Sequence, residues 1–489
     1  MIWLFFILAV LWRFQDLGLK AVHHDESING WFVMQIWGQG WFQYDPNNYH
    51  GPLFFYLLAL GERMGGFGIE SFRFVTALFS ALWLIYLWRF WNRNDWPARW
   101  TLVIVALSPA FFFFGRSAIH ETPFLFFMTL TLGGFYELFY KERAKAWLPI
   151  IWGTAGVITL KETWVLMAVA LLLSGLFLFI TSPQFRIALK NWRWFGRTWP
   201  REALVHLVLA ILVVVLLFTG FGARSQGLVD MVMTYLPWMK TGVHGSGHNK
   251  SVWYWLNLLW MYEKPLLFLF IGGVSTAVLF WRYLSLTTKW IFLGAVLQVL
   301  IYSLIPYKTP WCIIAVFGPL IFAMGCVRGD MRAIGFANPV QVLCGVLAVL
   351  FLFFQINDFK QLNFVNPTDH DHEYVYVQTD TRLKKLVDSL IEAAEAQPAL
   401  YKQKIQFGGT EPWPMVWWLG RFSNQEQRPV SKGVDKEPLL LIVDQQDEQT
   451  AFNALNVEDY QIFRFPIREG RAPSIFLLRK GSLKSEVKL

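Results

Sequence analysis

Long apolar segments are the feature of this sequence that most constrains its fold. About eleven stretches, each bounded by charged residues, Pro or Gly, approach the length that an α-helix needs to cross a bilayer. Only 16% of the residues are charged and 55% are hydrophobic, a balance typical of a chain whose main solvent is lipid. We therefore predict a polytopic α-helical membrane protein with spans near residues 1–14, 71–90, 98–114, 121–140, 146–160, 163–181, 203–220, 264–284, 288–305, 310–327 and 338–356.

The charged residues between these segments predict the orientation of the protein. The connection at 182–202 has one acid, Glu202, and five basic residues, Arg186, Lys190, Arg193, Arg197 and Arg201. Because short loops rich in Lys and Arg stay in the cytoplasm, we expect a cytoplasmic N-terminus in the cytoplasmic (inner) membrane. The loops 15–70 and 221–263 then lie outside, and an odd number of spans sends the residues after 356 to the same outer face.

The net charge of +9 does not indicate a nucleic-acid partner. Most basic residues flank the apolar segments, as membrane orientation requires, and do not form a single stripe. The three cysteines, Cys312, Cys326 and Cys344, lie in apolar runs. We expect them to be buried neutral thiols, because three cysteines cannot staple a chain of this length.

The composition changes after the last apolar segment. A helical stretch at 381–396 is interleaved with strand-like runs at 373–378, 439–444, 460–465 and 474–479. Strands that alternate with helices favour a small α/β domain, and about 130 residues is a usual domain size. The sequence therefore predicts a transmembrane domain at 1–356 and a small extracytoplasmic α/β domain at 357–489.

The first outer loop opens with the strongest candidate site. His23, His24, Asp25 and Glu26 follow the first span directly. Two acids beside two imidazoles at the hydrocarbon boundary are costly unless they are paired or bind a ligand. We therefore interpret them as a site, although a solvated loop whose acids face water is the alternative.

The rest of this loop is predicted to form a platform at the membrane surface. Apolar residues recur at helical spacing over 29–42 and 52–64, two stretches that are too short or too polar to span. They fit helices that lie in the interface plane. Between them, Tyr49 and His50 precede a Gly-Pro pair, which indicates a tight turn that presents polar side chains.

Two further groups of charges lie near bilayer depth on the outer side. Arg116, His120 and Glu121 stand between two apolar segments, and ionisable residues in such a position are more often functional than structural. Lys161 and Glu162 have the same character. For this second pair, the alternative is a Lys at a helix end that reaches the headgroups with Glu162 as its partner.

Two other outer segments complete the candidates. The stretch 244–250 contains His244 and His248 among glycines, which suits a mobile binding loop or ordinary exposed histidines. The stretch 306–311 places Tyr307 and Lys308 in a Pro-bounded break between two apolar segments. A cation there suits an anionic headgroup or phosphate.

Several of these motifs together resemble one known family. They are the pair Asp25-Glu26, the turn 49–52, and the stretches 108–121, 160–163, 248–265 and 307–311, with 373–380 and 411–422 in the tail. The combination is similar to the bacterial and archaeal family named for its association with flippase activity. That family is a branch of the C-type glycosyltransferases related to dolichyl-phosphate-mannose protein mannosyltransferases.

The resemblance implies a fold and an activity. The fold would be C-type glycosyltransferase-like, with interfacial helices in the first outer loop. The activity would be an inverting transfer from a polyprenyl-phosphate-linked sugar, of the undecaprenyl-phosphate type, at the outer membrane face. The acceptor would be a lipid, a glycan or a protein.

Roles follow for the candidate residues. A carboxylate must deprotonate the acceptor hydroxyl. We expect this of Asp25, with Glu26 orienting either Asp25 or the substrate. Cations must meet the leaving phosphate, which we expect of Arg116, Lys161 and Lys308. A divalent cation, Mg²⁺ or Mn²⁺, could bridge Asp25, Glu121 and the phosphate. The remaining candidates for substrate binding are His24, Tyr49, His50, His120, Glu162, His244, His248 and Tyr307.

A non-catalytic role is the alternative to transfer. An accessory or flippase-associated protein would bind the same lipid-linked sugars without making or breaking a bond. A transport path needs polar residues through the membrane depth. Here the ionisable residues gather on one side of the predicted spans, which favours the transferase.

Overall fold

The computed structural model describes residues 2–91, 96–140, 145–190, 200–244, 247–335, 339–468 and 470–483. The chain divides into two compact units. The first, which we call the helical unit, consists of Met1–Gln15, Trp41–Gly61 and Phe72–Val365. The second, the mixed unit, consists of Asp16–Gly40, Glu62–Ser71 and Asn366–Leu489. Two segments of the first loop thus group with the C-terminal residues.

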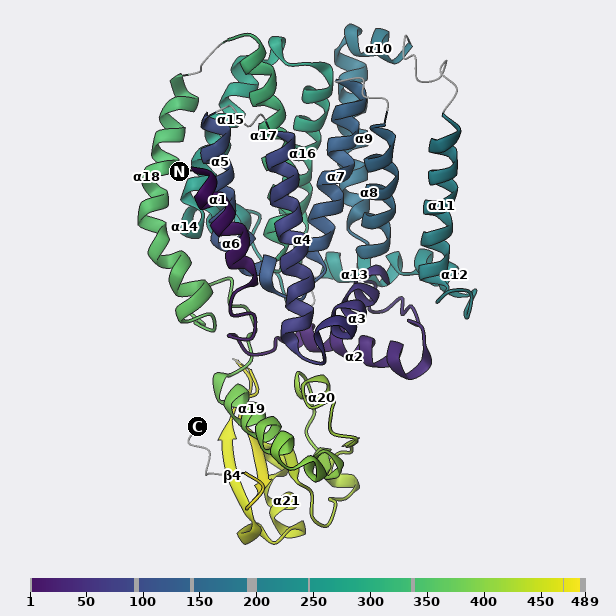
Figure 1. The fold of residues 1–489 in the computed structure, drawn as a ribbon, viewed down its shortest axis with the longest axis vertical. Coiled ribbons are helices and arrows are strands. Elements are labelled where there is room, and N and C mark those ends of the chain that lie inside the picture. The colour runs from purple at the N-terminus through teal and green to yellow at the C-terminus, as the bar shows by residue number, and fades with distance from the viewer. Residues whose placement is uncertain are drawn as a thin grey trace. The chain divides into compact units, whose positions relative to one another are not determined.

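Long apolar helices build the helical unit (Figure 1). Within the described ranges, seven helices are long and apolar enough to cross a membrane. They are α4 (Ile69–Phe90), α7 (Glu121–Phe139), α9 (Trp164–Thr181), α11 (Arg201–Phe218), α16 (Leu286–Leu304), α17 (Cys312–Ala333) and α18 (Pro339–Lys360).

The remaining predicted spans correspond to bent or short helices. Helix α5 (Trp96–Ala106) continues into α6 (Pro109–Phe113) with a bend of 58°, and α14 (Tyr254–Tyr262) continues into α15 (Lys264–Leu279) with a bend of 118°. Counting each bent pair as one span gives nine for the described residues. Two shorter apolar helices, α1 (Ile2–Leu11) and α8 (Trp147–Leu160), coincide with the remaining two predicted segments, 1–14 and 146–160. The polytopic helical fold is confirmed, and the count of eleven crossings stays a prediction.

The order of the helices sets two ends of the helical unit. Helix α7 begins at Glu121, α8 ends at Leu160 and α9 begins at Trp164, so these three positions share one end. Helix α9 then leads to α10 (Pro183–Lys190), which lies at the opposite end (Figure 1). Helix α10 carries two of the predicted cytoplasmic cations, Arg186 and Lys190, whereas Arg193 and Arg197 fall outside the described residues.

Small residues let α7 and α8 pack closely. A Cβ atom on Gly153 would lie 2.4 Å from the side-chain oxygen of Thr131, and one on Gly156 would lie 2.3 Å from the ring of Phe127. Close approach of this kind is how helices associate in a bilayer, where apolar burial alone gives little driving force. It brings the last turn of α8 against the first turn of α7.

A five-stranded sheet forms the core of the mixed unit. Its order is β2-β1-β3-β5-β4, with β1 parallel to β2 and β3, and β5 antiparallel to β3 and β4. The strands are β1 (Lys404–Phe407), β2 (Asn424–Gln427), β3 (Leu440–Asp444), β4 (Tyr460–Phe465) and β5 (Ser474–Arg479), and the helices include α19 (Thr381–Ala396), α20 (Met415–Trp418) and α21 (Glu448–Ala454). The predicted α/β domain, its helix at 381–396 and its last three strands are confirmed, while β1 and β2 were not predicted.

The strand predicted at 373–378 is wrong. Val377 has a left-handed backbone with φ of 53°, which an extended strand does not accommodate. The polar groups of this segment bind the first loop: the backbone oxygen of Tyr376 lies 3.0 Å from His23 Nε2, and Gln378 Nε2 donates to the backbone oxygen of Ala21 at 3.0 Å. The segment 373–378 therefore makes tertiary hydrogen bonds with the first loop, and its alternating polar residues do not indicate a strand.

Helix α2 (His24–Gln39) packs on the C-terminal residues of the mixed unit. It begins five residues before the predicted helix because His23 and Glu26 form a capping box. The hydroxyl of Ser27 donates to the backbone oxygen of Pro414 at 2.8 Å. A Cβ atom on Gly30 would lie 2.4 Å from the indole of Trp417, so only glycine fits this contact.

This contact predicts opposite effects for two glycines of one helix. Gly30→Ala should destabilise the protein by about 1–3 kcal/mol, because the added methyl group overpacks the helix against Trp417. Gly38→Ala is the matched control, since nothing lies within 4 Å of its Cβ position, and its melting temperature should be unchanged or slightly higher. Thermal unfolding of the purified full-length protein compares them. Equal melting temperatures would contradict the packing of α2.

Candidate functional site

A buried group of ionisable side chains lies at one end of the helical unit. We call it the ionic cluster, and it consists of His50, His120, Glu121, Lys161 and Glu162. The ammonium of Lys161 is paired with Glu121, and His50 Nδ1 lies 3.1 Å from Glu162 Oε2. The predicted alternative for Lys161, a helix-end cation reaching the headgroups with Glu162 as its partner, does not match these contacts.

The turn at 49–52 delivers His50 to the cluster. His50 and Lys161 form an antiparallel β-bridge, and the backbone nitrogen of Gly51 donates to the backbone oxygen of Leu160 at 3.0 Å. A Cβ atom at Gly51 would lie 2.2 Å from the backbone oxygen of Thr159. The absence of a side chain at Gly51 therefore permits this approach, and Tyr49 places its ring 5.2 Å from that of His50.

Burial makes the pairing in the cluster obligatory. Lys161 is 6% exposed, Glu121 3% and Glu162 5%. Removing such groups from water costs several kcal/mol each unless opposite charges and hydrogen bonds compensate. Burial alone disfavours the charged ammonium, but the adjacent Glu121 carboxylate holds the pKa of Lys161 above its ordinary value.

His120 supplies a neutral imidazole to the same cluster. It is 3% exposed, and its ring lies 4.5 Å from that of His50 and 4.3 Å from that of Phe54. Burial first, and then the neighbouring His50 and Lys161, hold the pKa of His120 well below its usual value. Its Nε2 atom has no hydrogen-bond partner among the described residues. A buried polar atom in this state is suited to a ligand.

Arg116, predicted to act with His120 and Glu121, ties other elements together. Its guanidinium donates to the backbone oxygen of Gln15, next to α1, and to that of Asn363, just after α18, at 3.2 Å for the latter. It also lies over the rings of Phe112 and Phe364. Its proposed contact with a substrate phosphate stays a prediction.

The stretches 244–250 and 306–311 meet in a short antiparallel pairing. Asn249 and Tyr307 form a β-bridge, and the rings of His248 and Tyr307 lie 5.1 Å apart. Lys308 is 2% exposed, and its ammonium donates to the backbone oxygens of Ile305 and Lys250. His244 is the last residue of α13 (Tyr235–His244), and Gly245 and Ser246 lie outside the described residues.

One neighbour of the cluster was not predicted as part of the site. Cys312 Sγ lies 4.0 Å from Glu121 Oε1 and 3.3 Å from Thr309 Oγ1. The sequence showed only a cysteine in an apolar run, because nothing in that pattern reveals that α17 begins beside α7. Cys312 is partly exposed, whereas Cys326 and Cys344 are buried.

The remaining predicted residues belong to the mixed unit, in the first turn of α2. Glu26 is fully buried, and its carboxylate accepts the backbone nitrogen of His23 at 2.9 Å. The backbone nitrogen of Asp25 donates to His23 Nδ1 at 3.1 Å. The carboxylate of Asp25 is thereby held at a fixed helix start, and this residue is half-buried.

Charged residues from the tail hold the neighbouring His24. Its Nδ1 atom lies 3.4 Å from Glu411, and Glu411 also accepts Arg468 at 2.7 Å. Burial is the main reason that the pKa of His24 lies below its usual value. Glu411 and Arg468 were not predicted as site residues, because a loop acid and a distant arginine carry no local signal that they meet.

The joint site predicted from the sequence spans both units. Asp25 and Glu26 belong to the mixed unit, whereas Glu121, Lys161 and Lys308 belong to the helical unit. Their meeting in one pocket stays a prediction. So does the divalent cation: in the described part of the chain, no group of three His, Cys, Asp or Glu side chains is arranged to hold a metal. Lys161 supplies the positive charge beside Glu121. No step of the proposed reaction involves a metal.

Known proteins resemble this fold and part of this sequence. The family model for dolichyl-phosphate-mannose-protein mannosyltransferases matches residues 49–218, a range that holds the whole ionic cluster. A crystal structure of ArnT from Cupriavidus metallidurans bound to undecaprenyl phosphate superposes with a TM-score of 0.66 at 12% identity, covering 99% of both chains. Its apo state gives a TM-score of 0.64 at 12% identity, covering 99% of this chain and 98% of the other. No curated protein sequence matches.

The comparisons identify the fold of the whole chain and a family likeness of one part of it. The multi-pass helical fold with a small sheet domain is that of ArnT, and the family model matches residues 49–218. The predicted resemblance to the dolichyl-phosphate-mannose protein mannosyltransferases is confirmed by the family model over residues 49–218.

The buried ion pair makes a stability prediction. Lys161→Met should destabilise the protein by about 3–5 kcal/mol, because it leaves the Glu121 carboxylate buried without a counter-charge. The partly exposed pair of Lys384 and Asp388 on α19 is the control, and Lys384→Met should cost less than about 1 kcal/mol. The double variant Lys161→Met/Glu121→Leu should recover much of the loss. Thermal unfolding in detergent measures all three, and a Lys161→Met protein as stable as the control would contradict the pairing.

Proposed function

We propose that this protein transfers a sugar from a polyprenyl-phosphate-linked donor to an acceptor hydroxyl at the extracytoplasmic membrane face, with inversion of the anomeric carbon. The observation that carries the proposal is the ionic cluster, a set of buried charges and a neutral imidazole at one end of a bundle with the ArnT fold. Ionisable groups at such depth are costly and mark substrate sites. ArnT was crystallised with undecaprenyl phosphate, which supports a lipid phosphate as the donor's leaving group.

The bond chemistry needs one base and one leaving group. Asp25 takes the proton of the acceptor hydroxyl while the oxygen of that hydroxyl bonds to the anomeric carbon. The bond from that carbon to the phosphate oxygen breaks on the opposite face, and its electron pair leaves with the polyprenyl phosphate. The capping box at His23 and Glu26 supports this role, because it fixes the helix start that carries Asp25.

The leaving phosphate needs positive charge where its oxygen gains electrons. Lys161 is the cation within the ionic cluster, and its ammonium has three donors, of which Glu121 takes one. We propose Arg116 and Lys308 as further cations. His50, held by Glu162, and His120, with its unpaired Nε2, are proposed to bind sugar hydroxyls together with Tyr49 and Tyr307.

The proposed outer location of the site follows from charge. The cluster lies at the end of the helical unit opposite to α10 and its basic residues. If α10 is cytoplasmic, as positive residues in short loops require, the cluster faces the outer leaflet of the cytoplasmic membrane. Lipid-linked sugars presented there are accessible to an acceptor lipid, glycan or protein outside the cell.

The decisive test is turnover with and without the proposed base. Purified protein is incubated with polyprenyl-phosphate-linked hexoses and pentoses, and the appearance of free polyprenyl phosphate is followed. Asp25→Asn should slow this release by about a hundredfold to ten-thousandfold, the usual contribution of a general base. Asp371→Asn, at an exposed acid of the mixed unit, is the control and should leave the rate unchanged.

Two outcomes would contradict the proposal. Full activity of Asp25→Asn would remove Asp25 from the role of base. Tight binding of every donor without release of polyprenyl phosphate by the unchanged protein would instead favour a non-catalytic accessory or flippase-associated protein. The thermal stability of each variant is measured alongside, so that loss of fold is separated from loss of chemistry.

A further inference from the structure

A cavity lies at the end of the helical unit opposite to the ionic cluster. It has a volume of about 250 Å³ and is lined by residues of α4, α5, α7, α15, α17 and α18. Its lining includes the ends of α4 and α17 and the start of α18, whereas the ionic cluster is built on the start of α7 and the residues after α8. The proposed transfer reaction does not use this cavity.

Two arginines on one helix give the cavity a positive lining. Arg328 and Arg332 are one turn apart on α17, so they share a face of the helix. No acidic residue stands among the described residues that line the cavity. Asp330 of the same helix accepts the backbone nitrogen of Ser285 at 2.8 Å, and its carboxylate also lies beside Tyr140, which lines the cavity. An anion is the ligand that this lining favours.

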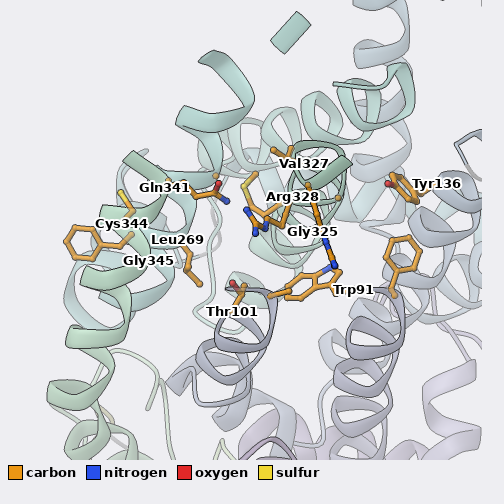
Figure 2. Close-up of a pocket in the computed structure, with 18 of the residues that line it drawn as sticks. Trp91, Thr101, Tyr136, Leu269, Gly325, Val327, Arg328, Gln341, Cys344 and Gly345 are labelled. Carbon is orange, nitrogen blue, oxygen red and sulfur yellow. The ribbon is translucent and has the colours of Figure 1, made fainter. Parts of the chain in front are cut away.

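An unpaired donor points to the same conclusion. Trp91 is 6% exposed, and its indole nitrogen has no hydrogen-bond partner in the described part of the chain. That nitrogen lies against Gly325, whose Cβ position would be 1.8 Å away. Figure 2 shows Trp91 and Arg328 lining one cavity with Thr101 and Gln341. A buried indole N–H without an acceptor is costly, and an acceptor-rich ligand in the cavity would satisfy it.

The surroundings of the cavity indicate a lipid. Its walls also include Phe268, Leu269 and Met324, which are apolar. Helix α18, which forms one side, exposes Leu343 at 60% and Val346 at 53%. Exposed aliphatic side chains on a long apolar helix are the surface that acyl chains cover. A lipid on this flank of α18 thus has its headgroup beside the cavity.

We propose that this cavity binds the phosphate of an anionic membrane lipid, in the leaflet opposite to the ionic cluster. Arg328 and Arg332 meet the phosphate oxygens, with Trp91 and Gln341 as further hydrogen-bond donors. Paired arginines suit phosphate because each guanidinium presents parallel donors. Basic pockets between membrane helices recognise anionic headgroups in this way. The volume of about 250 Å³ holds a headgroup, while the acyl chains stay along α18.

The test uses the full-length protein in nanodiscs or mild detergent. After delipidation, binding of phosphatidylglycerol, phosphatidylcholine and inorganic phosphate is measured by native mass spectrometry. Phosphatidylglycerol should bind at least about tenfold more tightly than phosphatidylcholine, which carries the same phosphate with a compensating cation. Equal affinity for the two lipids would overturn the proposal. Displacement of phosphatidylglycerol by an equal concentration of inorganic phosphate would assign the site to a soluble anion and overturn it as well.

Two kinds of variant separate the site from the fold. Arg328→Gln/Arg332→Gln should weaken phosphatidylglycerol binding by about tenfold or more. Gly345→Phe should do the same by filling the cavity. A Cβ atom at Gly345 meets nothing within 4 Å, so this second variant introduces no backbone clash.

Arg282→Gln, at an exposed arginine between α15 and α16, is the control. Wild-type affinity in both site variants would refute the assignment, and sugar-transfer activity is recorded to keep this result distinct from that of the proposed function.

Discussion

The pairing of Lys161 with Glu121 is the interaction on which the candidate site depends. Both groups are buried, and a bare charge at this depth would cost more than most tertiary contacts return. The chain therefore has to bring the first residue of α7 to the residue that follows α8. Glycines on α7 and α8 permit this approach, and the bridge from Lys161 to His50 then adds the turn at 49–52. One ion pair thus fixes three segments that are distant in sequence.

A second constraint comes from breaks in the helices, where buried arginines donate hydrogen bonds to backbone oxygens. Backbone carbonyls that lose their helical partner within a membrane protein must find a donor. Arg13 donates to the backbone oxygens of Ala9 at 2.6 Å and Ala106 at 3.1 Å, the second at the bend between α5 and α6. Arg116 serves Gln15 and Asn363 in the same manner. Such arginines resemble phosphate-binding residues in a sequence, which is why position alone does not separate the two roles.

The sequence predicted the helical fold well because each helix is specified locally. Apolar length and flanking charges located the helical segments, and the amphipathic pattern of 381–396 gave α19 with its exact bounds. The ionic cluster was predicted as separate pairs of residues, since Lys161 was weighed with its neighbour Glu162. Its actual partner, Glu121, is forty positions away in the chain, and no periodic pattern encodes that contact.

Other misses have the same physical origin. The run at 373–378 alternates like a strand, but its polar atoms bind the segment before α2, and this tertiary contact overrides local preference. Strands β1 and β2 are four residues each, too short to show a period. Glu411 beside His24 depends on how the tail folds against α2, which only coordinates reveal.

The two ends of the helical unit use their cations in different ways, and this difference has a mechanistic consequence. At one end Lys161 is neutralised by Glu121, so the phosphate of the proposed donor would share the ammonium with an acid that is already in place. Such a site holds its geometry before the substrate arrives, and little reorganisation accompanies the growth of charge on the leaving oxygen. At the other end Arg328 and Arg332 line the cavity, and no acid is among the described residues that line it with them. A preorganised, charge-balanced end suits a substrate that must leave after each turnover, whereas two arginines on one helix face suit an anionic headgroup that stays. Helix α17 joins the two, since it begins at Cys312 beside Glu121 and reaches Arg328 and Arg332 near its other end. A resident lipid at its far end would therefore brace the helix that forms one wall of the ionic cluster.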